Sequence, residues 1–253
     1  MMVDHLSSSL IKTYQQCPLK YWAIYIEKMP QVEPHPLTRL GLAVHEMMEA
    51  ATNCRIQGHH DHQRHDPMFW RDTAILENKV EPYLHGDIDT LVANAVRWGY
   101  FRNVHRTAGC EVELGFALPD GTKVTGFIDR LDLMPPDADI VDIKTQKNAF
   151  EPDELEDNWQ ARIYNIGARK IRPEITGKAT VSFWVLRHQV QRVVLTAKDA
   201  ENDIGRLVDI MGEIRACNNP EGRPSGLCPW CPYEKKCPDR DMPARERLRR
   251  ARR

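Results

Sequence analysis

Two short stretches carry charged side chains at strand positions where hydrophobic residues are usual. In "GFIDRLDL", the alternation of a β-strand places Asp129 on the same face as Phe127 and Leu131. In "IVDIKT", the same alternation places Asp142 and Lys144 together on one face. Both patterns therefore indicate carboxylates on strand faces that otherwise point to an interior.

A divalent cation is the chemistry that such a pair of carboxylates suits. Two carboxylates about 4 Å apart repel by roughly 4 kcal/mol even at an effective dielectric constant near 20, and burial without a partner usually ends in protonation. Mg²⁺ or Mn²⁺ removes both penalties, because these ions prefer carboxylate oxygens. Lys144 could then neutralise charge on a phosphoryl oxygen or orient a water. Taken alone, Asp142 and Lys144 also fit a buried ion pair on an edge strand.

Three further polar residues occur in helical patterns. His45 lies in the apolar stretch "GLAVHEMMEA", where an imidazole is either a hydrogen-bonded core group or a ligand. Gln160 and Tyr164 of "NWQARIYNIG" are four residues apart, which places them on one face of a helix. The order along the chain is thus His, Gly-x-x-Asp, Asp-x-Lys, Gln-x3-Tyr.

The cysteines fall into two groups. Four of the seven are each followed by proline: Cys17, Cys228, Cys231 and Cys237. Proline lacks an amide donor and disfavours helix for the residue before it, so these thiols are expected on turns. Such a set indicates a metal or cluster site, and zinc and an iron–sulfur cluster both suit four thiolates. The other three are expected to be small buried hydrophobic side chains: Cys54, Cys110 and Cys217.

Helices and a small sheet must position these residues. Helices are predicted near 8–16, from Pro18, and near 37–56, 67–80, 88–105, 153–171 and 197–216. Strands are predicted near 110–118, 123–134, 139–145, 179–187 and 189–195, with a hairpin at "PDGT". Helices followed by a small sheet that one helix crosses predict an α/β or α+β fold.

Composition excludes few functions. The chain has 253 residues, 42% hydrophobic and 28% charged, and a net charge of −1, which does not itself indicate a nucleic-acid partner. No apolar run approaches a membrane span and no signal peptide is evident, so a cytoplasmic location without a membrane partner is expected.

Two polar segments lie outside the motifs. The polar "GHHDHQRHD" is predicted to be a solvated loop. The arginine-rich tail fits either a solvated end or a phosphate-binding segment.

In this order the motifs resemble those of the RecB-type branch of the PD-(D/E)xK nucleases. The resemblance extends from "SSLIKTYQQCPLKYW" to "GLCPWCPYEKKCPD", most of the chain, and is specific to the iron–sulfur exonucleases typified by the CRISPR-associated exonuclease family and the AddB nuclease domain. It implies a restriction-endonuclease-like core, in which a small central mixed sheet is flanked by helices, with an N-terminal helical part and a C-terminal cluster-binding segment.

The resemblance also implies the metal ligands. His45 of "GLAVH", Asp129 of "GFID" and Asp142 of "DIK" would bind one or two Mg²⁺ or Mn²⁺ ions, and the carbonyl of Ile143 would be a further ligand. Because these ions would activate the attacking water, Asp129 and Asp142 would also count as catalytic residues.

The remaining catalytic roles follow from the same resemblance. Lys144 would be the catalytic lysine, and Gln160 and Tyr164 would support it and contact a substrate phosphate. A strand glutamate recurs before "GxxD" in relatives, and either Glu111 or Glu113 could correspond to it.

The four proline-flanked cysteines would bind a 4Fe-4S cluster that joins Cys17 to the far end of the chain. Closing so long a loop would constrain the unfolded chain substantially. Spacing alone leaves zinc open as the bound metal.

The function that the resemblance implies is a metal-dependent exodeoxyribonuclease. The expected substrate is mainly single-stranded DNA or DNA ends, in recombination, repair or CRISPR spacer acquisition, with recombination, helicase or CRISPR adaptation proteins as possible partners. The alternative is a module that binds or scaffolds DNA ends and whose cleavage is incidental. One integrated domain is expected, divided into 1–108 (helical), 109–216 (nuclease core), 217–241 (cysteine segment) and 242–253 (basic tail).

Overall fold

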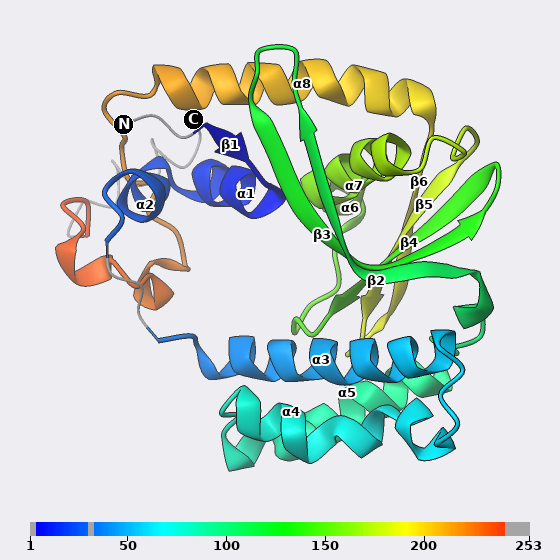
Figure 1. Ribbon diagram of the computed structural model, residues 1–253. Helices are drawn as coiled ribbons and strands as arrows, with labels where there is room; N and C mark the ends of the chain where they lie inside the picture. The colour runs from blue at the N-terminus through cyan, green and yellow to red at the C-terminus, as the bar shows by residue number, and fades with distance from the viewer. Residues whose placement is uncertain (1–3, 30–32, 241–253) are drawn as a thin grey trace. The chain divides into compact units, whose positions relative to one another are not determined.

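The computed structural model describes residues 4–29 and 33–240, which form two compact units (Figure 1). The first unit comprises the described residues within 1–33, 115–125 and 202–253. The second comprises 34–114 and 126–201. Each of these units combines separate parts of the chain, whereas the predicted segments are continuous. The predicted division stays a prediction. Its basic tail, 242–253, lies outside the described residues.

A mixed sheet organises the second unit. Its strands are β2 (Thr107–Ala117), β3 (Lys123–Met134), β4 (Asp137–Lys144), β5 (Ala179–Val185) and β6 (Gln189–Leu195). β4 pairs antiparallel with β3 and parallel with β5, β6 pairs antiparallel with β5, and β2 pairs with β3. The predicted mixed sheet and α/β class are confirmed.

Strand β4 is central because its sequence can be buried on both faces. Val141 and Ile143 are at most 2% exposed on one face, and Ile140 and Asp142 are equally buried on the other. Parallel strands with both faces covered read as nearly continuous apolar runs, and Asp142 is the exception within this one. In the parallel register with β5, Asp142 is opposite Phe183.

Helices flank this sheet. They are α3 (Pro36–Ile56), α4 (Arg71–Glu77), α5 (His85–Arg97), α6 (Pro152–Glu156) and α7 (Trp159–Ile171). One of them, α4, packs on α3. Figure 1 shows α3 and α5 side by side, and their apolar faces share one buried cluster with β4 and β5. The predicted apolar face of α3 is the buried one, with Leu40, Val44, Met47, Met48 and Ala51 each at most 1% exposed.

The predicted helix over 153–171 is two helices. Asn158 interrupts it, because its side-chain oxygen accepts hydrogen bonds from the backbone N–H groups of Gln160 (3.0 Å) and Ala161 (3.2 Å), as an N-cap does. Later in α7, a Cβ at Gly167 would lie 2.9 Å from the side chain of Leu114 in β2. Glycine at this position therefore allows α7 to approach the sheet closely.

The first unit contains the N-terminal helices and the cysteine segment. Its elements include β1 (His5–Leu6), α1 (Ser8–Gln16), α2 (Pro18–Tyr21), a π-helix (Trp22–Ile26) and two 3-10 turns (Cys228–Trp230 and Glu234–Lys236). β1 pairs parallel with the start of β3. Helix α8 (Ala197–Ala216) begins in the second unit and continues in the first.

The tip of the β2–β3 hairpin is stabilised within the first unit. Gly121 has a φ of +84°, which suits the predicted "PDGT" turn. Arg215 of α8 contacts the Asp120 carboxylate at 2.6 Å and donates to the Thr122 hydroxyl at 2.9 Å. Among the described residues, no helix is long and apolar enough to span a membrane.

Candidate functional site

A cavity of about 980 Å³ opens in the second unit beside the predicted motifs. Helix α3 contributes His45, strand β2 contributes Glu111, strand β3 contributes Asp129, and the end of β4 contributes Ile143 and Lys144. Residues far apart in the sequence are thus brought to one place by the pairing of three strands and the packing of one helix.

Asp129 links the helix to the central strand. Its Oδ2 atom lies 3.3 Å from His45 Nδ1 and accepts a hydrogen bond from the backbone N–H of Ile143 at 2.6 Å. The Asp129 side chain is 13% exposed, and the neighbouring Phe127 is 54% exposed. This end of the predicted interior face of β3 is therefore open to solvent, which allows a ligand to reach the carboxylate.

Glu111 joins His45 and Asp129. One ligand atom from each of the three side chains lies within 4.8 Å of the others, and Glu113 is not part of this group. Glu111 has a φ of +45°, unusual for a residue other than glycine. Strict alternation would put both glutamates on one face, and this left-handed residue breaks the alternation. No sequence pattern signals such a conformation, so the choice between the two glutamates needed the structure.

Asp142 lies at the centre of a second group of polar side chains, on the face of β4 that α7 covers. Its Oδ1 accepts hydrogen bonds from Gln160 Nε2 (2.8 Å) and from the Tyr164 hydroxyl (3.0 Å). Gln160 Oε1 in turn accepts from Lys144 Nζ at 2.8 Å. The Asp-x-Lys and Gln-x3-Tyr motifs therefore meet directly, as residues on one face of a strand and one face of a helix.

The second oxygen of Asp142 contacts only the lysine ammonium. Asp142 Oδ2 lies 2.7 Å from Lys144 Nζ but outside hydrogen-bond geometry, and the oxygen is buried. The Asp142 side chain is 2% exposed, whereas that of Lys144 is 23% exposed. Lys144 thus extends from a buried carboxylate to the cavity, which it lines.

The carboxylates influence one another's ionisation. Burial raises the pKa of Asp142, the Lys144 ammonium opposes that effect, and the nearby Asp129 charge adds to it. Burial also raises the pKa of Glu111, as does the charge of Asp129. Burial lowers the pKa of His45, but the Asp129 carboxylate outweighs it, so that the pKa is raised.

The glycines of two motifs allow close packing at the site. A Cβ at Gly41, in "GLAVH", would lie 3.1 Å from the Thr145 hydroxyl at the end of β4. A Cβ at Gly126, in "GFID", would lie 3.2 Å from the Leu114 side chain and 3.9 Å from the Tyr164 ring. Glycine at the first position of each motif therefore lets a helix or strand approach its neighbour closely enough to bring the motif's last residue into the site.

The donor set fits a hard divalent cation. An imidazole and two carboxylates supply ligand atoms from three elements, and Asp142 has a buried oxygen without a hydrogen bond. A cation at this place would offset both burial and the charge of Asp129, two causes that raise the pKa of Glu111 and of Asp142. The predicted role of the Ile143 carbonyl as a ligand stays a prediction.

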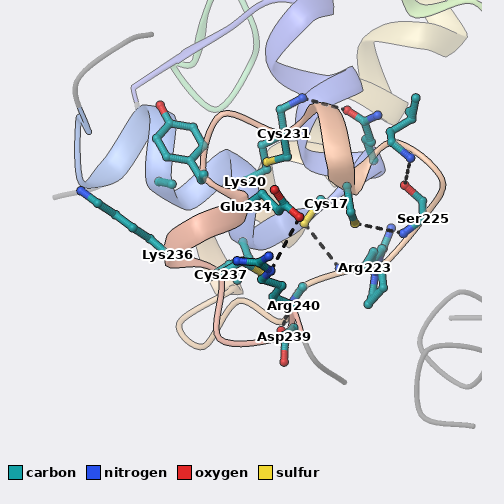
Figure 2. Close-up of a pocket in the computed structure, with 18 of the residues that line it drawn as sticks. Cys17, Lys20, Arg223, Ser225, Cys231, Glu234, Lys236, Cys237, Asp239 and Arg240 are labelled. Carbon is teal, nitrogen blue, oxygen red and sulfur yellow. Dashed lines mark hydrogen bonds and ion pairs between the residues drawn. The ribbon is translucent and has the colours of Figure 1, made fainter. Parts of the chain in front are cut away.

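The first unit holds the four proline-flanked cysteines in one pocket of about 630 Å³. Figure 2 shows Cys17, Cys231 and Cys237 in this pocket, and Cys228 also lines it. Cys17 Sγ accepts a backbone N–H at 3.4 Å and Cys228 Sγ accepts another at 3.2 Å. Backbone N–H groups that point at sulfur also occur around the thiolates of clusters and metals, and the predicted 4Fe-4S cluster stays a prediction.

The sulfur atoms are not gathered tightly. Among the described residues, no three cysteine sulfurs lie within 4.8 Å of one another. A single zinc ion with four bonds of about 2.3 Å would need closer sulfurs, whereas the thiolates of a 4Fe-4S cluster each bind a different iron and stand further apart. As they stand, the four cysteines form no closed metal site.

The other cysteines and the histidine-rich loop line neither of these two pockets. Cys54 is buried as predicted, whereas Cys110 and Cys217 are half-buried. In the loop, His59 stacks on His60, and the residues that follow form a 3-10 turn, His62–His65. Among the described residues, none of these histidines joins a group of potential metal ligands.

A comparison with protein-family models decides the family. The model of the PD-(D/E)XK nuclease superfamily matches residues 5–238. The chain belongs to the PD-(D/E)XK nuclease superfamily. This match confirms the predicted superfamily and places the chain among the nucleases, whereas the narrower likeness to the CRISPR-associated exonucleases and to the AddB domain stays a prediction.

The chain resembles two solved structures to different degrees. A protein from Eubacterium rectale, provisionally described as an exonuclease, is 12% identical with a TM-score of 0.54, over 92% of this chain and 88% of that one. The structure of the protein SSO0001 is 15% identical with a TM-score of 0.33, over 91% and 95% of the two chains. No curated protein matches the chain's sequence. The first likeness supports the nuclease fold.

Proposed function

We propose that this PD-(D/E)XK nuclease is a Mg²⁺- or Mn²⁺-dependent DNA exonuclease. The observation that carries the proposal is the Asp129 carboxylate, which contacts His45 on one side and the backbone N–H of Ile143 on the other. That hydrogen bond fixes the candidate metal ligands next to the Asp-x-Lys strand. Metal ligands and a lysine therefore converge on one cavity, as hydrolysis of a phosphodiester requires.

His45, Glu111, Asp129 and Asp142 would hold the ion, together with the carbonyl of Ile143. A bound Mg²⁺ or Mn²⁺ supplies a more acidic water and stabilises charge on the phosphodiester oxygens. The protein's part is to keep these ligands in place. The hydrogen bonds from Gln160 and Tyr164 orient Asp142 Oδ1, while Oδ2, which accepts no hydrogen bond and lies 2.7 Å from the Lys144 ammonium, would be the oxygen that binds the ion.

Lys144 is the residue proposed to act on the substrate directly. Its ammonium is anchored by Asp142 and by Gln160 Oε1, and it remains partly exposed to the cavity. A fixed positive charge there can stabilise the negative charge that develops on the phosphate oxygens. Gln160 and Tyr164 are positioning residues, since each contacts Asp142 and their own hydrogen bond joins them at 2.7 Å.

The proposed substrate is single-stranded DNA or a DNA end. The sequence contains no GxxxxGK[ST] motif, so a helicase or another recombination, repair or CRISPR adaptation protein would supply the strand. A cytoplasmic location stays a prediction from the sequence.

The proposed second cofactor is a 4Fe-4S cluster bound by the four cysteines that share the pocket of Figure 2: Cys17, Cys228, Cys231 and Cys237. The backbone N–H groups directed at two of the sulfurs support the proposal. The cluster would connect the N-terminal helices of the first unit with the cysteine segment. A zinc ion bound by the same four cysteines would make the same connection.

End-labelled DNA tests the proposed activity. Purified protein is incubated with linear single-stranded, linear double-stranded and circular single-stranded DNA, in Mg²⁺, in Mn²⁺ or in a chelator. Metal-dependent shortening of linear single strands, with circles intact, is expected. Cleavage of circles would contradict exonuclease action. Binding of ends without degradation in either metal would favour the alternative of a DNA-end binding module.

A further inference from the structure

The candidate cavity carries more positive charge than its catalytic lysine alone provides. Apart from His45, its cationic side chains among the described residues are Lys144, Lys147 and Arg187. Lys147 lies in the loop after β4, and Arg187 lies in the turn between β5 and β6. Neither was singled out from the sequence, because both occur in turns where a charged residue is ordinarily solvated.

Arg187 is held in place by two acceptors of the second unit. Its Nε donates to the carbonyl of Thr145 at 3.3 Å, and its Nη2 donates to the Asp87 carboxylate at 3.0 Å. The side chain is 28% exposed, and its Nη1 bonds to no other described residue. The guanidinium is thus oriented at the cavity edge, just beyond the end of the catalytic strand, with donors to spare for an anion.

Lys147 differs from Arg187 because, among the described residues, no acidic group pairs with its side chain. Its ammonium is exposed, while its backbone carbonyl contacts the His188 ring next to Arg187. Side chains of the β5–β6 turn, those of Arg187 and His188, thus bond to backbone carbonyls of the loop after β4, and both cations line the same cavity. Acidic side chains such as Glu46 and Glu49 line the same cavity from α3.

Exposed leucines on α3 complete the surroundings. Leu37 is 50% exposed and Leu42 is 52% exposed, and both line this cavity. The cavity has cationic side chains on loops and apolar side chains on α3. Single-stranded DNA can contact both kinds, because its phosphates are charged and its unpaired bases present apolar faces. A duplex hides those faces in its stack, so the leucines would add nothing to its binding.

We infer that Lys147 and Arg187 bind the backbone phosphates next to the scissile one, and that Leu37 and Leu42 contact the bases of that single strand. This inference rests on the proposed function and adds the residues that position its substrate. Lys147 and Arg187 supply charge contacts whose strength falls with salt, whereas the leucines supply contacts that salt hardly changes.

Binding of labelled oligo-dT at several salt concentrations, with Ca²⁺ replacing Mg²⁺, separates the two kinds of contact. Lys147→Gln and Arg187→Gln should each reduce the slope of log K against log salt by about 0.7, the value for one phosphate contact on a single strand. Leu42→Gln should weaken binding several-fold and leave the slope unchanged. Lys170→Gln, an exposed lysine at the end of α7 outside the cavity, is the matched control and should alter neither quantity.

Cleavage in Mg²⁺ gives the second readout. Lys147→Gln should raise KM several-fold and leave kcat within about threefold, because a phosphate contact away from the reacting atoms strengthens the ground and transition states alike. An unchanged salt slope for Lys147→Gln, whose ammonium has no ion-pair partner in the described part of the chain, would overturn the inference while the nuclease stands. Wild-type protein that degrades no DNA would instead overturn the proposed function.

Discussion

The carboxylate–lysine site of the second unit and the cysteine pocket of the first differ in how far the chain itself fixes their polar groups. Asp142 is almost completely buried and is held by hydrogen bonds from Gln160 and Tyr164. The four cysteines are only half-buried, and two of them, Cys17 and Cys228, each accept one backbone N–H.

This difference indicates which site needs its cofactor in order to fold. Strand pairing and helix packing already orient the carboxylates, so a metal ion adds charge balance and chemistry to a preformed site. The cysteine segment consists of short 3-10 turns, and a bound cluster or metal would supply the links that secondary structure does not. Removing the first cofactor should cost activity, and removing the second should cost stability.

The largest expected effect is on catalysis at Asp142. Asp142→Asn keeps the shape of the side chain but removes the charge that pairs with Lys144, and we expect cleavage to fall by about 10³-fold or more. Single-turnover degradation of end-labelled DNA measures the loss. Asp139→Asn, on the same strand and bonded to Ser182, is the control and should retain activity within about threefold. Wild-type rates for Asp142→Asn would remove this residue from the site.

The next effect concerns stability and the cysteines. Cys17→Ala and Cys231→Ala should each destabilise the protein by more than about 4 kcal/mol, because either change would release the proposed cluster or metal that links the two cysteine segments. Cys54→Ala, a buried cysteine of α3, should cost only about 1 kcal/mol.

Denaturant unfolding of protein purified without oxygen gives these values, and about four irons per chain are expected in the wild type. Stoichiometric zinc without iron would identify zinc as the ligand of the four cysteines. A Cys17→Ala protein as stable as Cys54→Ala would show that no shared group is bound.

A smaller effect tests how tightly α3 must approach β4. Gly41→Ala would place a methyl group 3.1 Å from the Thr145 hydroxyl, and the resulting shift of α3 moves His45. We expect cleavage to slow by about tenfold, as when other groups that orient ligands are lost. Gly86→Ala, on α5 with no atom within 4 Å of the new Cβ, should instead raise stability by about 0.5–1 kcal/mol.

Rescue sharpens that test. The double variant Gly41→Ala/Thr145→Ser loses the threonine methyl but keeps the hydroxyl that the new alanine methyl meets, so the close contact remains. The double variant Gly41→Ala/Thr145→Ala lacks that hydroxyl, so activity should return only in this variant. Equal activity in both double variants would assign the loss to something other than this contact.

The smallest effect is expected from the histidine-rich loop. Replacing its four histidines by glutamine should leave nuclease rates within a few-fold, because among the described residues none of them lies in a group of potential metal ligands. The same end-labelled DNA assay measures this, and complete loss of activity would reveal a ligand at one of the replaced positions: His59, His60, His62 and His65.

Local patterns in the sequence determined most of the secondary structure. Apolar periodicity defined α3, alternation and β-branched residues defined β3 and β4, and the "PDGT" turn joined β2 to β3. The break between α6 and α7 was missed, because a single Asn158 cap stops a helix while leaving the apolar period intact.

The sequence also shows which side chains of the Asp-x-Lys and Gln-x3-Tyr motifs can face each other. The sequence places Asp142 and Lys144 on one strand face and Gln160 and Tyr164 on one helix face by periodicity alone, and one helix–strand contact then forms the whole group. Only tertiary structure chose Glu111 over Glu113, because a left-handed residue within a strand depends on surroundings that alternation does not contain.

Tertiary structure alone also decided which surface residues share the cavity. Lys147 and Arg187 are 40 positions apart in turns that look merely solvated, and the parallel pairing of β4 with β5 brings those turns to one edge. Strand register and the order of strands arise from the packing of the whole sheet, and short-range patterns carry no information on either. The sequence by itself therefore determined the motifs of the candidate site, and the fold decided what surrounds them.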